Sequence, residues 1–390
     1  MVQKRLGIIM NGVTGRMGMN QHLVRSILEI RKQGGVALKD GTRAMPDPIL
    51  VGRNAAKVEA LAQKHGVERW TADLDKALQS KDEIFFDAAS TQLRPSLLKK
   101  AIAAGKHVYC EKPLTHNIRE ARLVARVAKE TGVATQMGNH GRSGEGHRQT
   151  VEWIKDGAIG AVSAVHAWSG NARTAKNPGP GQGPTAQPSG LNWDLWLGPR
   201  TARPFSGKYA PFVWRWVWDF GNGTMPDMAP HHFDPAFNAL GLDAPVTMEA
   251  RASDLDPVVT TGSHLITYQY AAQGNRGPLT LYWYDNGLRP PTPLGIDPDD
   301  PQQRLGEGDN GLMFVGEKGI LTCAGWSGMP RLLPMVTAGS TYEVRASIVS
   351  GASRPSALKA GSKWWGDMSG MVPLPKSHTQ RQTNGATLPV

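Results

Sequence analysis

The sequence has few cysteines and no long apolar segment, and these absences exclude several classes of protein. Its 390 residues contain two cysteines, Cys110 and Cys323, which lie far apart and lack the spacing of a metal site or a disulfide framework. No apolar run approaches the ~18 residues that a membrane span requires. The apolar stretch 6–10 is shorter than the core of a signal peptide, which has at least ~7 residues. We therefore expect a cytoplasmic protein that binds no metal.

Acidic residues are in deficit, because 33 Asp and Glu residues face 44 Lys and Arg residues, for a formal net charge of +11. A basic balance can indicate a nucleic acid, an anionic membrane surface or acidic small molecules as partners. The basic residues are interleaved with acids, however, and the sequence contains no basic helix or aromatic–basic stacking module. An anionic cofactor, alone or with an acidic small-molecule substrate, explains the excess, and we expect neither nucleic acid nor membrane as a partner.

The first third of the chain alternates β-rich runs with helical stretches. The predicted strands are 6–10, 48–51, 84–88, 107–110 and 134–137. The predicted helices between them are 17–32, 55–65, 97–104 and 119–131. Strands that alternate with helices indicate a parallel sheet covered on both faces. We expect a doubly wound domain over residues 1–137.

The character of the sequence changes near residue 138. A predicted helix, 150–156, and a predicted strand, 162–169, precede a stretch rich in Gly and Pro over 171–190, which is long for a connection. Further predicted strands are 264–270, 279–284, 311–315 and 319–322, of which the last two form a hairpin. Their alternation is typical of an antiparallel sheet with one covered face. We expect this second domain over 138–344, followed by an irregular or disordered tail over 345–390.

A glycine-rich turn follows the first predicted strand. Residues 11–18 read Asn-Gly-Val-Thr-Gly-Arg-Met-Gly and lead into the helix that follows. In a dinucleotide-binding loop, glycine lets the backbone approach a pyrophosphate, and the helix N-terminus offers N–H groups to it. The spacing Gly-x-x-Gly-x-x-Gly differs from the standard Gly-x-Gly-x-x-Gly, so a purely structural turn stays an alternative. The candidate cofactor contacts here are Gly12, Thr14, Gly15, Arg16, Met17 and Gly18.

The end of the second predicted strand bears on the type of cofactor. An NAD enzyme usually places Asp or Glu there to hold the adenosine ribose, but this sequence has Gly52, Arg53 and Asn54. The Arg53 guanidinium can pair bidentately with a 2′-phosphate, which favours NADP over NAD. Alternatively, Arg53 stacks on the adenine or faces solvent. Arg53 and Asn54 are candidate cofactor contacts.

The strand 107–110 ends in the turn Glu111-Lys112-Pro113, at the edge where open α/β sheets bind ligands. The Lys112 ammonium can hydrogen-bond a substrate hydroxyl and stabilise the alkoxide that develops there. Pro113 fixes the turn. Glu111 and Lys112 are therefore candidate cofactor contacts, and Lys112 is also a candidate catalytic and substrate-binding residue.

A third motif is Asp-Met-Ala-Pro-His-His-Phe-Asp over residues 227–234. Residues four apart share a helix face, so Asp227 and His231 can point into one pocket, with Asp234 within reach. A carboxylate that orients an imidazole makes a competent general base for a secondary alcohol. The alternatives are a core histidine and a metal site, and no third ligand has convincing metal spacing.

Tryptophans cluster between residues 193 and 218. Sugar rings stack their C–H faces on indoles, but tryptophan is also ordinary core material. Trp193 is therefore a candidate substrate contact with a structural alternative. Candidate anion contacts for an acidic sugar, with a solvated surface role as the alternative, are Arg142, His147, Arg148, Lys208 and Arg215.

Together these motifs resemble the superfamily of glucose-fructose oxidoreductase, inositol 2-dehydrogenase and rhizopine catabolism (Gfo/Idh/MocA). The resemblance covers roughly residues 5–340. It rests on the glycine turn, the runs 104–113, 138–140, 157–160 and 193–199, and the Asp-x-x-x-His-x-x-Asp pattern. It implies a Rossmann domain and a C-terminal α/β domain whose open, mainly antiparallel sheet carries the substrate. A homo-oligomer, dimer or tetramer, is also implied.

The same resemblance implies roles for individual residues. Lys112, Asp227 and His231 form the implied catalytic set, with His231 as the acid/base. Asn139 is an implied cofactor contact and His140 an implied substrate contact.

The chain also departs from the family pattern. It has Ala89-Ser90-Thr91-Gln92 where the family usually has Thr-Pro-Asn, which makes Ser90 and Thr91 the candidate cofactor contacts there.

The expected function is hydride transfer between NAD or NADP and a hydroxyl of a sugar, sugar derivative or cyclitol. One alternative is a NAD-dependent glycoside hydrolase that oxidises, eliminates, adds water and re-reduces. Such an enzyme needs a second base, for which Tyr209 and His232 are the candidates among the substrate contacts. Another alternative is a non-catalytic sensor that binds NAD(P).

Overall fold

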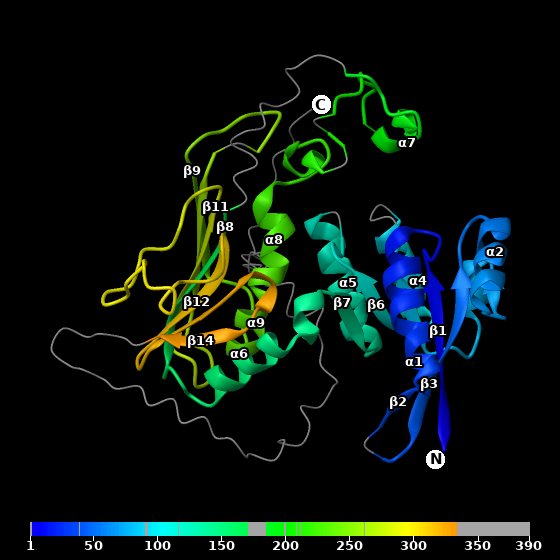
Figure 1. Cartoon of the computed structure of the whole chain (residues 1–390), viewed down its shortest axis with the longest axis horizontal. Coiled ribbons are helices and arrows are strands. Elements are labelled where there is room, and N and C mark those ends of the chain that lie inside the picture. Colours follow the sequence, from blue (N-terminus) through cyan, green and yellow to red (C-terminus); the bar gives the residue numbers. More distant parts are fainter. Residues whose placement is uncertain are drawn as a thin grey trace, which may run out of the picture.

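The computed structural model describes residues 2–333, with gaps at 39, 90–92, 116, 171–184, 199, 208, 211 and 261. The predicted tail and the candidates Ser90, Thr91 and Lys208 lie outside the described residues. Two sheets with their helices make up the described part, and α8 (Thr224–His232) lies on the side of the second sheet that faces the first (Figure 1). No described helix is both long and apolar enough to cross a membrane.

The first sheet has the strand order β2-β3-β1-β5-β6-β7, with β4 paired to β3. Its strands are β1 (Gln3–Asn11), β2 (Val36–Ala37), β3 (Arg43–Val51), β4 (Trp70–Thr71), β5 (Ile84–Asp87), β6 (His107–Glu111) and β7 (Thr135–Gly138). All pairings are parallel except that of β2 with β3. The chain runs from β1 to β3 on one side and later to β5 on the other, which creates a topological switch point beside β1.

Helices cover both faces of this sheet. They are η1 (Met17–Leu28), a π-helix that continues into α1 (Glu29–Lys32), α2 (Ala55–His65), α3 (Leu74–Leu78), α4 (Arg94–Ala103) and α5 (Ile118–Thr131). Ile9 of β1 packs into one apolar cluster, and its neighbours Ile8 and Met10 pack into another. Strand side chains alternate between faces, so β1 is buried on both sides, as expected of a doubly wound domain.

Strand β3 is longer than predicted, because it begins at Arg43 rather than at residue 48. Pro46 and Pro48 lie within this strand, although proline has no N–H to donate to a neighbouring strand. The backbone nitrogens of residues 46, 48 and 50 lie on the same side of β3. On that side the Leu50 N–H donates to the carbonyl oxygen of Arg69, next to β4. On that side of β3, β2 pairs near its start and β4 pairs at its end. The two prolines therefore face the gap between these short strands, where no N–H is required.

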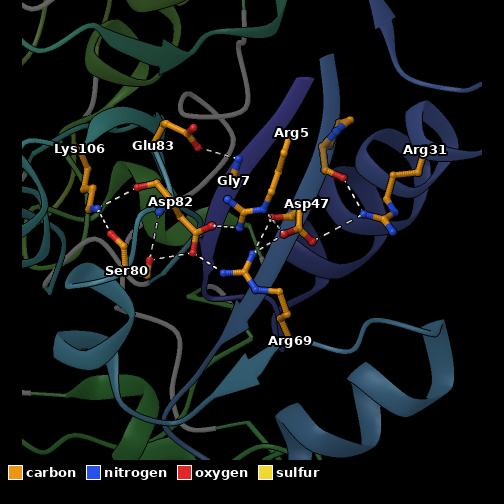
Figure 2. A network of polar contacts seen from close by, with 10 residues as sticks. Arg5, Gly7, Arg31, Asp47, Arg69, Ser80, Asp82, Glu83 and Lys106 are labelled. Carbon is orange, nitrogen blue, oxygen red and sulfur yellow. Dashed lines mark hydrogen bonds and ion pairs between the residues drawn. The ribbon is translucent and has the colours of Figure 1, made fainter. Parts of the chain in front are cut away.

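A polar network ties together the amino-terminal ends of the central strands (Figure 2). The Asp82 carboxylate is buried and accepts hydrogen bonds from Arg5, Arg69 and Ser80. Asp47 accepts from the same two arginines. Burial opposes the charged form of Asp82, but these hydrogen bonds outweigh it and lower the pKa of its carboxyl. The network stabilises the edge of the sheet opposite to the glycine-rich turn.

The second sheet has the order β14-β13-β12-β8-β11-β10-β9. Its strands are β8 (Val162–Ser169), β9 (Thr247–Ala252), β10 (His264–Tyr270), β11 (Leu279–Asp285), β12 (Asn310–Gly316), β13 (Ile320–Cys323) and β14 (Pro330–Leu333). The pairing of β8 with β11 is parallel and the others are antiparallel. The predicted fold class, a Rossmann domain followed by an α/β domain with a mainly antiparallel sheet, is confirmed.

One face of the second sheet packs against helices. These are α6 (Glu145–Lys155), α8 and α9 (Asp234–Leu240). Val165, Leu281 and Phe314 of the sheet lie in one apolar cluster with Met228 of α8 and Phe237 of α9. Because this packing fixes α8 from behind, the other side of α8 is left to face the first domain. The short elements α7 (Trp193–Leu197), η2 (His140–Ser143), η3 (Val213–Trp216) and η4 (Gly325–Ser327) complete the described part.

Candidate functional site

The glycine-rich turn leaves β1 at the switch point of the first sheet. Gly12 has φ +79°, and a Cβ built there would lie 2.6 Å from the carbonyl carbon of Ala88. A Cβ at Gly18 would lie 2.5 Å from the Gly12 carbonyl oxygen. No side chain fits at either position. The turn is therefore held tightly against the strands, while residues 14–17, at the start of η1, are exposed.

This geometry fits a dinucleotide pyrophosphate. The exposed residues of the turn and the first turn of η1 present backbone N–H groups at a helix N-terminus, which is an anion-binding arrangement. Thr14, Gly15, Arg16 and Met17 lie in this exposed stretch, and Gly12 and Gly18 shape the turn behind it.

The two predicted cofactor contacts after β3 differ in whether their side chains already have a structural role. Arg53 is exposed directly after the end of β3. The Asn54 side chain caps α2 by accepting a hydrogen bond from the Lys57 N–H at 3.0 Å. Arg53 is thus free to approach a ligand, whereas the Asn54 side-chain oxygen already has a structural partner.

Arg94 braces the carboxyl edge of the first sheet, a role that sequence reasoning missed. Its buried guanidinium pairs with Asp87 at the end of β5, with 3.0 Å between Nε and Oδ2. It also donates to the carbonyl oxygens of Glu111 and Pro113. Asp87 in turn accepts from the Asn11 side chain at 2.8 Å. In the sequence Arg94 is an ordinary basic residue near a helix start, so nothing in the pattern distinguishes it.

The Glu111-Lys112-Pro113 turn follows β6 and has a cis peptide bond before Pro113. The Glu111 carboxylate lies 2.8 Å from His22 Nε2 and accepts from the Tyr109 hydroxyl. A Cβ at Gly138 would lie 2.6 Å from the same carboxylate, so the Glu111 side chain would have to shift to admit a larger residue there. The turn is thereby fixed on both sides of Lys112.

Lys112 joins the two domains. Its Nζ donates to both the backbone oxygen and the Oδ1 of Asp227 on α8, each at 2.8 Å. The other carboxylate oxygen, Oδ2, accepts from Arg215 Nε at 3.1 Å. An ammonium has three N–H donors, and among the described residues Asp227 takes two of them. No described residue is seen to accept the third N–H of Lys112.

His231 lies beside this pair, one helical turn after Asp227. It is buried, and its Nδ1 has no hydrogen-bond partner among the described residues. Burial first, and then the charge of Lys112, lower its pKa to about 3. The imidazole is therefore neutral at pH 7. His140, which is exposed, has its ring centroid 5.3 Å from that of His231.

Asp227 and His231 were expected to point into one pocket, with the carboxylate orienting the imidazole. In the structure the Asp227 carboxylate is instead held by Lys112 and Arg215. The negative charge of the carboxylate raises the pKa of His231. Burial and the charge of Lys112 lower that pKa by more. Asp227 thus organises the cations of the site more directly than it orients the histidine.

A buried polar cluster contacts the end of α8 and the start of α9. The Asn139 amide donates to the Pro230 carbonyl at 2.5 Å and to Asp234 at 3.1 Å, and Arg142 donates to Asp234 at 2.8 Å. Burial raises the pKa of the Asp234 carboxyl to about 7, against the opposing effects of Arg142 and Asn139. His147 lies at the edge of this cluster, and burial lowers its pKa to about 4. Asn139 therefore contacts α8 at Pro230, directly before His231, and Asn139 and Arg142 both bind Asp234 at the start of α9.

The remaining predicted substrate contacts lie in packed surroundings. His232 is buried, and its Nδ1 lies 3.0 Å from the Met228 carbonyl. Trp193 and Tyr209 are buried in an aromatic cluster with their ring centroids 5.8 Å apart. Arg148, an anion candidate, is exposed and paired with Glu145. Substrate roles for His232, Trp193 and Tyr209 stay predictions.

The described residues contain no group of three or more His, Cys, Asp or Glu side chains that could hold a metal ion. Cys110 and Cys323 are buried free thiols, and burial raises the pKa of both.

Comparison with known families agrees with this arrangement. Residues 37–139 match the family model described as "Oxidoreductase family, NAD-binding Rossmann fold" (GFO_IDH_MocA), and residues 165–276 match its C-terminal alpha/beta domain. The chain is 40% identical over 178 residues to a D-xylose dehydrogenase of Paenarthrobacter nicotinovorans, a match that covers 44% of this chain and 46% of that protein. It is 29% identical over 120 residues to a 1,5-anhydro-D-fructose reductase of Ensifer adhaerens, covering 30% of this chain and 36% of that protein. The matches therefore span less than half the length of these relatives.

Solved structures show the same fold. An NAD binding oxidoreductase from Klebsiella pneumoniae aligns with a TM-score of 0.55 and 19% identity, covering 83% of this chain and 74% of that one. A levoglucosan dehydrogenase in complex with NADH and levoglucosan aligns with a TM-score of 0.53 and 17% identity, covering 82% and 73%. With both of its domains matched by models of one family, the chain belongs to the Gfo/Idh/MocA oxidoreductase family.

Proposed function

We propose that the protein transfers hydride between a nicotinamide cofactor, NAD or NADP, and a hydroxyl of a sugar, sugar derivative or cyclitol. The observation that carries this proposal is the meeting of Lys112, from the dinucleotide-binding domain, with Asp227 and His231 of the second domain. The names of the relatives, D-xylose dehydrogenase and 1,5-anhydro-D-fructose reductase, support a sugar-like substrate.

The chain's own residues bind and deprotonate the substrate hydroxyl. The third N–H of Lys112 donates to the hydroxyl oxygen and stabilises the negative charge that grows there. Asp227 binds the ammonium, and Arg215 in turn holds the Asp227 carboxylate. His231 is neutral at pH 7 and takes the hydroxyl proton, while the carbon that bears this oxygen loses hydride and forms a carbonyl. The nicotinamide, when bound, supplies the two-electron acceptor for that hydride.

The cofactor is proposed to lie along the exposed N-terminus of η1 and to reach the Lys112 turn at the same edge of the sheet. Arg53 is exposed after β3, and a guanidinium there could pair with a 2′-phosphate, which supports NADP alongside NAD.

The test combines two cofactors with a substrate panel. The purified protein is incubated with NAD, and separately with NADP, against D-xylose, D-glucose, myo-inositol and chromogenic glycosides, and reduced nicotinamide and released aglycone are followed together. Accumulation of reduced cofactor with a sugar or cyclitol is expected. Aglycone release that requires cofactor but gives no net reduction would establish a glycosidase instead.

Variants test the assigned residues. Lys112→Met and His231→Asn should each lower kcat by roughly 10²- to 10⁴-fold, the usual loss for a general acid/base or an alkoxide-stabilising donor. The matched control is His166→Gln on β8, because His166 is similarly buried but its neighbours Val165 and Ala167 face the helices and its own side chain faces away. Full activity of His231→Asn would refute the assignment of the base.

A further inference from the structure

The loop before β14 has a strained backbone at two bulky or polar positions. Trp326 has φ +56° and ψ 32°, and Ser327 has φ +60°. The left-handed region is unfavourable for a residue other than glycine, and such strain concentrates at functional sites. The strain at Trp326 therefore calls for a physical explanation.

Close packing imposes this conformation. A Cβ at Gly141 of η2 would lie 2.4 Å from the Trp326 carbonyl oxygen, and a Cβ at Gly146 of α6 would lie 2.5 Å from the Ser327 carbonyl oxygen. The Ser327 hydroxyl is also buried, 3.4 Å from His147 Nδ1. The loop backbone thus packs directly against two glycines, one before α6 and one in its first turn.

The strained loop holds the Trp326 indole against the histidines of α8. The ring centroid of Trp326 lies 6.3 Å from that of His231 and 5.9 Å from that of His232. Yet 39% of Trp326 is exposed, whereas His231 is buried. A partly exposed tryptophan therefore adjoins the proposed base.

We propose that Trp326 is the surface on which the ring of the substrate stacks, so that it selects sugars and cyclitols that present a C–H face. This inference rests on the proposed function, since it names the group that holds the ring whose hydroxyl meets His231. The face of an indole carries negative charge density and attracts the weakly positive C–H groups of a ring whose hydroxyls are equatorial. The hydroxyls at the ring edge are then directed toward Lys112 and His231. Substrate stacking explains why an exposed tryptophan is kept in a conformation that costs free energy.

The decisive variant is Trp326→Gly, because glycine adopts this backbone conformation without strain. If Trp326 serves substrate binding, the variant should unfold within about 2 °C of the wild type or above it, since relief of strain offsets the lost contacts. KM for D-xylose should rise roughly 10- to 100-fold, the range for loss of one apolar contact surface, while kcat changes less than about threefold. Trp326→Phe, which restores an aromatic face, should recover part of the loss in KM.

The control is Met329→Ala, which alters an exposed apolar side chain of the same loop, 55% exposed, and should leave KM unchanged. An unchanged KM in Trp326→Gly would overturn the inference while leaving the proposed function intact. A large fall in thermal stability of Trp326→Gly, with KM changing equally in Met329→Ala, would show that the tryptophan only maintains the loop.

Direct binding separates this inference from the proposed function. Saturation-transfer NMR with D-xylose should give signals on the sugar C–H protons in the wild type and lose them in Trp326→Gly. If the protein binds D-xylose in this way but oxidises no sugar with either cofactor, the stacking surface stands and the proposed function fails. If the wild type gives no signal with D-xylose and no saturable oxidation of it, the inference is overturned.

Discussion

Replacing His166 by glutamine should remove part of the acid sensitivity of the second domain. His166 lies on β8 with 9% of its surface exposed, and its Nδ1 lies 3.0 Å from the Tyr284 hydroxyl. Its ring stacks on Tyr282 with 4.8 Å between centroids, and Met313 of β12 is its partner in register. These neighbours carry no charge at neutral pH. Burial alone therefore lowers the pKa of His166 to about 4.

The sign of this pH dependence follows from the pKa of His166 in the unfolded and in the folded chain. The unfolded chain has a histidine pKa of about 6.5, so it binds a proton before the folded protein does. The stability contributed by neutral His166 is present above pH ~6.5 and is lost as the pH falls from there toward 4. Between pH 7.5 and pH 5 this one group should reduce the free energy of unfolding by about 2 kcal/mol.

The assay is urea unfolding at pH 7.5 and pH 5, with linear extrapolation to water. Tryptophan fluorescence reports on the right part of the molecule, because Trp70 is the single tryptophan before residue 138. The glutamine variant cannot titrate, so its loss of stability between the two pH values should be about 2 kcal/mol smaller than that of the wild type. His166→Phe, which keeps a ring, provides a second variant for the same difference. Equal losses in wild type and both variants would refute the reasoning, because His166 would then be charging freely in the folded protein.

Three further substitutions test the supporting structure. Gly12→Ala should weaken cofactor binding and destabilise the first domain by roughly 1–3 kcal/mol, since the added Cβ would meet the Ala88 backbone. The control is Gly66→Ala, because Gly66 also has a positive φ but has open space around it. This control should leave cofactor affinity unchanged in a fluorescence titration. Asp82→Asn should cost about 2–3 kcal/mol in urea unfolding by leaving two arginines without their buried partner, while Asp75→Asn, an exposed pair, should cost less than about 0.5 kcal/mol. Arg215→Met should lower kcat roughly 10- to 100-fold by freeing the Asp227 carboxylate, with affinity for NAD(P) unchanged in the same titration.

Much of the fold was predictable because local signals and tertiary packing agree. Helix α2 was predicted over its observed range, 55–65, and α5 ends at Gly132, which adopts the expected left-handed conformation with φ +69°. Strand β8 also has its predicted bounds. The two helices have apolar residues at helical spacing, an asparagine N-cap and a glycine C-cap.

The elements that sequence reasoning missed lack such signals. Strand β9 is exposed along its whole length and so has no alternating pattern. Helix α6 begins at Glu145 rather than at residue 150, because Gly144 and Gly146 obscure its first turn. Gly146 is needed for the close approach of the loop at Ser327, a contact between segments far apart in sequence that no local pattern encodes.

Part of the candidate site was likewise predictable from sequence motifs, and part of it was not. The motifs predicted that Lys112, Asp227 and His231 would carry the chemistry, and the structure brings the three together at the junction of the domains. The partners of these residues were not predictable. Arg94 acts through carbonyl oxygens, and Trp326 reaches the site through a strained loop, so both depend on three-dimensional packing rather than on spacing.

The most direct test of the central claim is the fate of the hydrogen on the reacting carbon. The protein would be incubated with NAD or NADP and with sugars deuterated at every carbon, starting with D-xylose, and the reduced cofactor would be analysed by mass spectrometry. Direct hydride transfer predicts reduced nicotinamide that carries one deuterium, formed by the wild type and lost in His231→Asn. Reduced cofactor without deuterium, or none with any sugar of the panel, would contradict the proposed function.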